Sequence, residues 1–162
     1  MSPYPATLVE IAERFCPSDH RKEIFRGFLA YRQALAGIGL DAGFQWLSGS
    51  FMEDIEALEG RLPGDVDVVT FCRRPAVART DPDWQAFVTV NDALLDPDLI
   101  RASFRCHAFL VDMDLIPEAV ISYSRYWYGL FAHRRGGLWK GLLEISLPVT
   151  ADDADAAVLV HP

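Results

Sequence analysis

The sequence predicts one α/β (α+β) domain, in which helices flank a small mixed sheet of about four strands. Short apolar runs rich in valine, leucine and isoleucine alternate with segments of helical periodicity, and glycine or proline separates many of them. The 162 residues suffice for one domain with a real core and are too few for two comfortable ones. We therefore expect a single domain over residues 1–150, followed by an acidic, loosely held tail over residues 151–162.

Helices are predicted near the N-terminus. Thr7 and Glu10 have the spacing of a capping box, which starts a short helix through Phe15. Over residues 19–36, apolar side chains recur at steps of four, three and four residues, which indicates an amphipathic helix that ends at Gly37. Its buried stripe is predicted to consist of Ile24, Phe28, Tyr31 and Leu35.

Four later segments are predicted to be strands, because they are apolar and bounded by turn residues. Helices are expected around them, and Pro117 suits the first turn of the last one. The predicted strands span residues 43–48, 65–72, 105–114 and 138–147. The predicted helices span residues 51–58, 84–95, 97–103 and 117 to the Gly136–Gly137 pair.

Composition excludes some classes of function. The formal net charge of −8 makes extensive nucleic-acid binding improbable, because such affinity grows with the phosphates that Lys and Arg neutralise. A small triphosphate ligand stays compatible, since a metal ion and a few local basic groups suffice. No apolar run approaches the roughly 18 residues of a membrane span, and the N-terminus lacks the pattern of a signal peptide. Cys16, Cys72 and Cys106 are interpreted as buried free thiols, so we expect a cytoplasmic protein.

One stretch carries the chemistry: "LSGSFMEDIEALEGRLPGDVDVVTF", residues 47–71. Asp65 and Asp67 point to the same face of a strand, where like charges destabilise each other unless a cation such as Mg²⁺ lies between them. Gly49 lets the backbone pass close to a ligand. Ser50 is expected at the N-terminus of the following helix, where free N–H groups attract phosphate. Taken singly, each feature is more often a solvated strand end or an ordinary turn.

In this order, the residues resemble the nucleotidyltransferase superfamily typified by DNA polymerase beta, and in particular small bacterial stand-alone members of it. The resemblance implies a third acidic residue on a later strand. Asp112 is our first choice because it lies deeper in the apolar run, and Asp114 is the alternative; either would also bind the metal. The fourteen residues between Ser50 and Asp65 make a long spacer, so either the helix carries an extra turn or "EGRLPG" is an insertion.

Basic residues offer contacts to phosphate. Lys140 on the fourth predicted strand either binds a phosphate or is an edge-strand lysine in solvent. Arg134 and Arg135 are better placed to cap a helix, although they would reach a triphosphate. Arg73 and Arg74 follow the Asp-x-Asp strand directly, where a solvated loop is favoured and contacts to phosphate or the acceptor are the alternative. His107 is interpreted as structural. The aromatic residues 126–128 are expected to be mostly core, with the alternative that one exposed ring stacks on a base.

The resemblance implies a metal-dependent nucleotidyltransferase with an NTP as substrate and Mg²⁺ or Mn²⁺ as cofactor. It would transfer a nucleoside monophosphate to the hydroxyl of a small molecule, a protein or an RNA 3′ end, and release pyrophosphate. At this chain length, a partner protein or self-association would complete the site. One rival hypothesis is a non-catalytic nucleotide-binding or interaction subunit, such as a component of a toxin–antitoxin or defence pair. Another is an unrelated α/β domain whose aspartates bind a structural metal.

Overall fold

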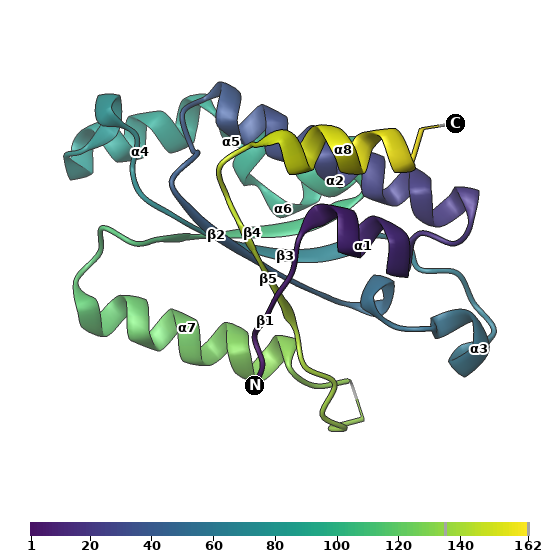
Figure 1. The fold of residues 1–162 in the computed structure, drawn as a ribbon. Coiled ribbons are helices and arrows are strands. Elements are labelled where there is room, and N and C mark those ends of the chain that lie inside the picture. The colour runs from purple at the N-terminus through teal and green to yellow at the C-terminus, as the bar shows by residue number, and fades with distance from the viewer. Residues whose placement is uncertain (135, 162) are drawn as a thin grey trace.

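A mixed sheet of five strands runs through the middle of the protein in a computed structural model that describes residues 1–134 and 136–161 (Figure 1). The strand order is β1-β5-β2-β3-β4. The strands are β1 (Tyr4–Pro5), β2 (Gly43–Ser48), β3 (Val66–Cys72), β4 (Cys106–Asp112) and β5 (Leu143–Ser146). The helices are α1 (Leu8–Phe15), α2 (Asp19–Gly37), α3 (Ile55–Glu59), α4 (Asp81–Val90), α5 (Asp92–Leu95), α6 (Pro97–Phe104), α7 (Pro117–Phe131) and α8 (Ala151–Leu159), with single 3₁₀ turns η1 (Ser50–Met52) and η2 (Ala76–Ala78).

Strand directions decide which ends of the strands meet. β2 is antiparallel to both β3 and β5, whereas β4 is parallel to β3 and β1 is parallel to β5. Asp67 on β3 is therefore opposite Ser48 at the end of β2 and opposite His107 near the start of β4. The end of β2 and the starts of β3 and β4 thus share one end of the sheet.

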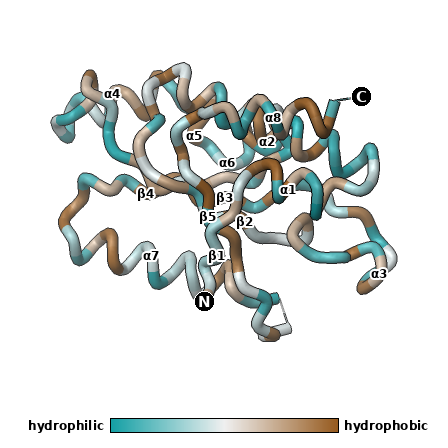
Figure 2. Tube along the Cα trace, in the orientation of Figure 1, coloured by the Kyte–Doolittle hydropathy of each residue, from teal (hydrophilic) through white to brown (hydrophobic). Residues whose placement is uncertain are grey.

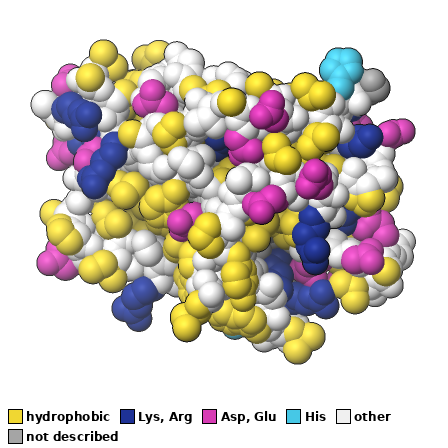
Figure 3. Space-filling view, in the orientation of Figure 1, with side chains coloured by type: hydrophobic (Ala, Val, Ile, Leu, Met, Phe, Trp, Pro, Cys, Tyr) yellow, Lys and Arg dark blue, Asp and Glu magenta, His cyan; other side chains and the backbone are white. Residues whose placement is uncertain are grey.

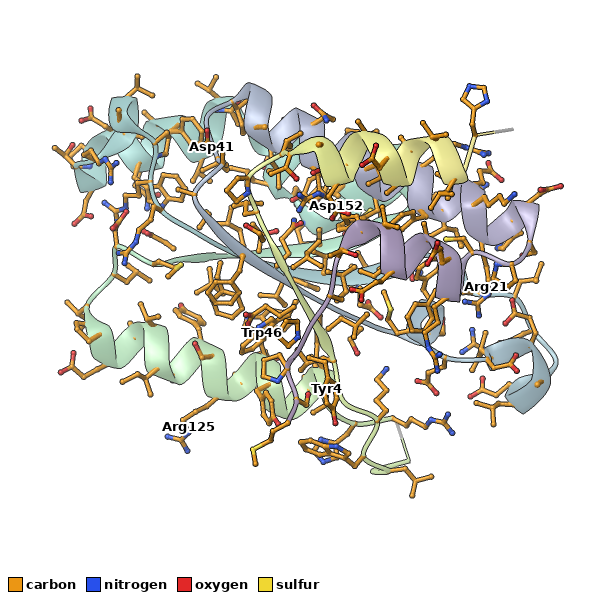
Figure 4. All side chains as sticks on the ribbon, viewed as in Figure 1. Tyr4, Arg21, Asp41, Trp46, Arg125 and Asp152 are labelled. Carbon is orange, nitrogen blue, oxygen red and sulfur yellow. The ribbon has the colours of Figure 1, made fainter. Side chains whose placement is uncertain are left out.

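Each face of the sheet buries its own apolar cluster. Helices α1, α2, α6 and α8 cover one face, and α7 covers the other (Figure 1). Successive side chains of β3 alternate between these faces, so that Val68 packs toward α2 and Val69 packs toward α7. Figure 4 shows Trp46 between the sheet and α7, and the hydrophobic residues of the strands lie between the two helical layers in Figure 2. A mixed α/β sheet, as the sequence predicts, is confirmed.

The predicted helix stripe is confirmed in α2. All four of its side chains are at most 1% exposed, and each contributes about 1.5–3 kcal/mol through burial. The capping box that precedes α1 is present as well: Glu10 N donates to Thr7 Oγ1, and Thr7 N donates to a carboxylate oxygen of Glu10. Local sequence patterns are sufficient to start and orient these two helices. The strand predicted over residues 43–48 has those bounds in β2.

Four elements of this part of the fold differ from the sequence-based expectations. The short β1 is a fifth strand that two residues are too few to signal, and β5 is shorter than the predicted strand over residues 138–147. The helix predicted over residues 84–95 belongs to a segment that breaks at Asn91 into α4 and α5. The helix predicted over residues 51–58 is split into η1 and α3, because Asp54 caps the second piece.

The spacer before Asp65 is long because of a loop. α3 ends at Gly60, which adopts a left-handed conformation, and no regular structure follows until β3. The loop is held by His20, whose Nε2 lies 2.7 Å from the carbonyl oxygen of Pro63. Of the two explanations for the spacing, the inserted loop therefore agrees with the structure and an extra helical turn does not.

The residues expected to form a loose acidic tail instead form α8, which packs on α1 and α2 (Figure 1). Asp153 is 4% exposed and pairs with the buried Arg32, at 2.7 Å between Oδ1 and Nε. Asp152, labelled in Figure 4, accepts hydrogen bonds from the backbone N–H groups of Leu8 and Val9 at the start of α1. Two of the acidic residues thus make specific structural contacts. Composition alone does not distinguish such a segment from a solvated tail.

Within the two described stretches, the helices are too short or too polar to cross a membrane.

Candidate functional site

The site is built where β2 ends and β3 begins. Gly49 follows Ser48 with φ 83° and ψ −172°, a conformation almost restricted to glycine. A Cβ placed on Gly49 would lie 2.9 Å from Cγ of Asp67 and closer still to Oδ2. Glycine is therefore required here for two reasons, the backbone conformation and the close approach of the Asp67 carboxylate.

The two aspartates of the Asp-x-Asp stretch lie close together. Burial raises the pKa of Asp67, and the charge of Asp65 raises it further, while His107 and Lys140 oppose the shift. Asp65 lies just before β3, and its side chain is only 13% exposed. Its Oδ2 is buried without a hydrogen bond, although Nε of Arg101 lies 2.6 Å away as an ion-pair partner. This oxygen is therefore buried against Arg101 and is not open to solvent.

Positive charge approaches this pair from the segment between α7 and β5. Nζ of Lys140 donates a 3.2 Å hydrogen bond to the carbonyl oxygen of Gly49 and a 3.1 Å hydrogen bond to Glu53. Nε of Arg134 lies 2.5 Å from the other carboxylate oxygen of Glu53. Lys140 was expected on a strand, and it lies before β5 instead, where its backbone N–H bonds to Ala132. Arg135 lies outside the described residues.

Ser50 adjoins Gly49 at the start of η1. Because the expected helix is divided, Ser50 is not at the N-terminus of a regular helix, and the anion site expected from a helix N-terminus does not form. The structure thus brings Gly49, Ser50 and Lys140 to the end of the sheet where the two aspartates lie. It does so through the turn after β2 rather than through a helix.

Asp112 is not part of this site. It lies five residues beyond His107 on β4, which is roughly 16 Å along the strand at the usual rise per residue. Five is an odd number, so Asp112 also points to the opposite face. There Oδ2 accepts a 2.7 Å hydrogen bond from Nε of Arg74, which is 5% exposed.

Asp114 lies at the same distant end. It accepts hydrogen bonds from the backbone N–H of Arg74 and from Nη1 of Arg73. Both arginines, expected in a solvated loop, are therefore held by carboxylates of the β4 end. The three-carboxylate arrangement expected from the sequence does not form, because β4 runs parallel to β3 and only its first residues approach Asp67.

His107 takes the position next to Asp67, with its Nδ1 3.2 Å from Oδ1 of Asp67. The sequence favours a structural role for His107 and gives no signal for Glu53. Aligning the starts of "DVDVVTF" and "RCHAFLV" as parallel strands would have placed His107 beside Asp67. For Glu53, nothing in the local sequence indicates its partners, which come from residues 134 and 140.

The protein surface has two hollows near the ends of β4 and β2. One of about 560 Å³ is lined by Glu53 together with residues of α1, α2 and α3, including Arg14 and Arg21. A larger one of about 720 Å³ lies at the other end of β4, beside Arg74 and Asp112. The smaller hollow reaches the candidate site through Glu53, and Asp65, Asp67 and Lys140 line neither of the two. Figure 3 shows Lys and Arg side chains beside Asp and Glu side chains on the side of the protein where α3 lies.

The donor set limits the metal that would fit. No cluster of three metal-ligating His, Cys, Asp or Glu side chains occurs among the described residues. Mg²⁺ is often held by one or two carboxylates, with phosphate and water oxygens completing its octahedron. Asp65 and Asp67, whose carboxylates lie near each other, fit one such ion shared with a ligand, provided that Asp65 exchanges its contact with Arg101 for the ion. They do not fit an ion enclosed by protein side chains alone.

Comparison with known proteins gives a family. No curated protein and no solved structure matches the chain. A comparison with protein families matches residues 2–146, which include every element from β1 to β5. The chain therefore belongs to DUF6932, which is described as a family of unknown function.

Proposed function

We propose that this protein is a metal-dependent nucleotidyltransferase, which transfers a nucleoside monophosphate from an NTP to an acceptor hydroxyl and releases pyrophosphate. The observation that carries the proposal is the packing of the Gly49 backbone against Asp67, with Lys140 bonded to the Gly49 carbonyl. Acidic groups suited to a cation and basic groups suited to phosphate thereby meet at one glycine turn.

Asp65 and Asp67 would hold Mg²⁺ or Mn²⁺, which supplies charge neutralisation at the phosphates when bound. Lys140 and Arg134 would bind the β- and γ-phosphates and stabilise the charge that develops on the leaving pyrophosphate. In the transfer, the acceptor oxygen bonds to the α-phosphorus, the bond from that phosphorus to pyrophosphate breaks, and the hydroxyl proton passes to solvent. These residues act mainly by position and charge, which is what phosphoryl chemistry requires of a protein.

The acceptor is proposed to be a small molecule, a protein or an RNA 3′ end. Each of these would contact only a small basic patch on the protein. The net charge of −8 is unfavourable for a long nucleic acid. A partner protein or a second copy of the chain would complete the acceptor side, because little of the chain remains outside the sheet and its covering helices.

A second candidate function is a nucleotide-binding subunit without catalysis, such as part of a toxin–antitoxin or defence pair. One observation favours it: the neighbour of Asp67 on β4 is His107, and the carboxylates of Asp112 and Asp114 lie at the other end of the strand. A site with two carboxylates retains the means to bind a metal–nucleotide complex while lacking the third acidic group.

The two functions separate in one assay. Purified protein is incubated with Mg²⁺ or Mn²⁺ and each α-labelled NTP, with itself and candidate hydroxyl compounds as acceptors, and pyrophosphate release and label transfer are measured. Turnover that Asp67→Asn abolishes, and that the exposed control Asp92→Asn retains, supports the transferase. Metal-dependent binding without turnover supports the second function. Absence of any NTP binding rejects both.

A further inference from the structure

Glu53 lies between the two cations that the proposed function assigns to phosphate. Its carboxylate is 2.5 Å from Nε of Arg134 and 3.1 Å from Nζ of Lys140. The side chain of Glu53 is 10% exposed and that of Lys140 is 12% exposed, so their contact is largely shielded from water, whereas the side chain of Arg134 is 36% exposed. Coulomb attraction in such a place is stronger than at an open surface.

Within this trio one carboxylate faces an arginine and a lysine, and the Asp67 carboxylate adds a second negative charge near Lys140. Arg134 and Lys140 therefore face separate single carboxylates rather than one group with several negative charges. Taking ions out of water is costly unless their partners compensate fully. A ligand with several negative charges would therefore satisfy Arg134 and Lys140 better than the single carboxylate of Glu53 does.

The Glu53 backbone is held independently of its side chain. Its carbonyl oxygen accepts a 2.6 Å hydrogen bond from Nη2 of Arg21, and its N–H donates to the Ser50 carbonyl. Arg21, labelled in Figure 4, is 3% exposed and also donates hydrogen bonds to the Phe51 carbonyl oxygen and the Glu56 carboxylate. Release of the carboxylate from the two cations thus requires rotation of one side chain and no movement of the turn.

From these contacts we propose that Glu53 is an internal substitute for a phosphate group. Its carboxylate occupies the place between Arg134 and Lys140 that the polyphosphate of a ligand takes, and the ligand displaces it. The inference rests on the proposed function and deepens it by naming the phosphate contacts and their competitor. It implies that Glu53 keeps both cations positioned before the ligand arrives and lowers the affinity for polyphosphate.

The test uses inorganic tripolyphosphate and isothermal titration calorimetry. Glu53→Gln is expected to bind tripolyphosphate roughly tenfold or more tightly than the wild type, as one additional charge-assisted hydrogen bond to the ligand would produce. Glu59→Gln is the matched control, because Glu59 lies six residues later in an exposed pair with Arg61. It is expected to leave the affinity unchanged. Lys140→Met in the Glu53→Gln background is expected to return the affinity to that of the wild type or below.

Equal or weaker binding by Glu53→Gln overturns the inference, as does tighter binding that survives Lys140→Met. Circular dichroism establishes that each variant is folded. If Glu53→Gln does not fold, Glu53→Asp replaces it: the carboxylate is withdrawn by one methylene, and a smaller increase in affinity is required. Tighter binding without nucleotide turnover leaves the inference standing and rejects the transferase. Nucleotide turnover without tighter binding of tripolyphosphate by Glu53→Gln rejects the inference and leaves the transferase standing.

Discussion

Nδ1 of His107 lies 3.2 Å from Oδ1 of Asp67, across the parallel pair of strands β3 and β4. This contact shows which residue of β4 is the neighbour of the acidic pair. Asp112, by contrast, is bonded to the buried Arg74 at the far end of the strand. Asp67 and Asp112 both lie on apolar strands, but their surroundings differ. Asp67 lies in the candidate site, whereas Asp112 pairs with an arginine in the interior.

We expect Gly49 to be required both for stability and for nucleotide binding. Gly49→Ala is expected to cost about 3 kcal/mol or more of unfolding free energy, because the backbone conformation alone costs about 1–3 kcal/mol and the new Cβ also overlaps Asp67. Urea unfolding measures the loss, and titration with Mg²⁺–NTP is expected to show no binding.

Gly60→Ala is the control for that prediction. Gly60 also has a positive φ, 65°, but nothing lies within 4 Å of an added Cβ. Its cost is expected to be about 1–2 kcal/mol, with nucleotide binding unchanged. Equal effects at both glycines would contradict the argument from the contact with Asp67.

The buried pair between α2 and α8 is expected to be important for stability. Arg32 is 2% exposed and bonds to Asp153 and Gln45. Arg32→Met leaves the Asp153 carboxylate buried without its partner, so we expect a loss of about 3–5 kcal/mol in urea unfolding. Arg61→Met, which removes an exposed pair, is expected to cost less than about 1 kcal/mol. A loss below that of Arg61→Met would mean that α8 is not tied to the domain through this contact.

Asp112→Asn is expected to lower stability and to leave nucleotide binding unchanged. It removes one of the two carboxylates that pair with Arg74, while Asp81 remains, so we expect a loss of about 1–3 kcal/mol in unfolding free energy. Because the site lies at the other end of the sheet, Mg²⁺–NTP affinity is expected to change by less than about twofold. Asp67→Asn should show the opposite pattern, with binding lost. Loss of metal-dependent binding in a folded Asp112→Asn variant would restore Asp112 as a site residue.

Stability at low pH is expected to depend on Glu56. Its hydrogen bonds from Arg21 lower the pKa of Glu56 from 4.5 to about 2. A carboxyl group with a lowered pKa stabilises the fold above its unfolded value, and the contribution fades as pH falls toward the folded value. The difference in unfolding free energy between wild type and Glu56→Gln should be constant above about pH 5 and shrink between about pH 4.5 and 2.

Glu59→Gln controls for the removal of a glutamate from the same helix, and both differences are measured by urea unfolding across this pH range. A Glu56 difference that stays flat down to pH 2 would contradict the role of Arg21. Since a third of the Glu56 side chain is exposed, the contribution is expected to be modest.

The sequence alone determined several of the local elements and the residues of one turn. Periodicity identified the buried stripe of α2, and the run of apolar residues with its bounding turns identified β2 and β3. Gly49 and the Asp65–Asp67 pair were recognisable because a glycine at a strand end and two carboxylates on one face are unusual for purely local reasons.

Only the tertiary structure decided which residues meet. Strand periodicity is the same for parallel and antiparallel neighbours, so it could not indicate that β4 approaches Asp67 with His107 rather than Asp112. Glu53 likewise meets Arg134 and Lys140 through the path of the chain between α7 and β5, about 80 residues away in sequence. Such contacts depend on how elements are arranged in space, and a local pattern carries no information about that arrangement.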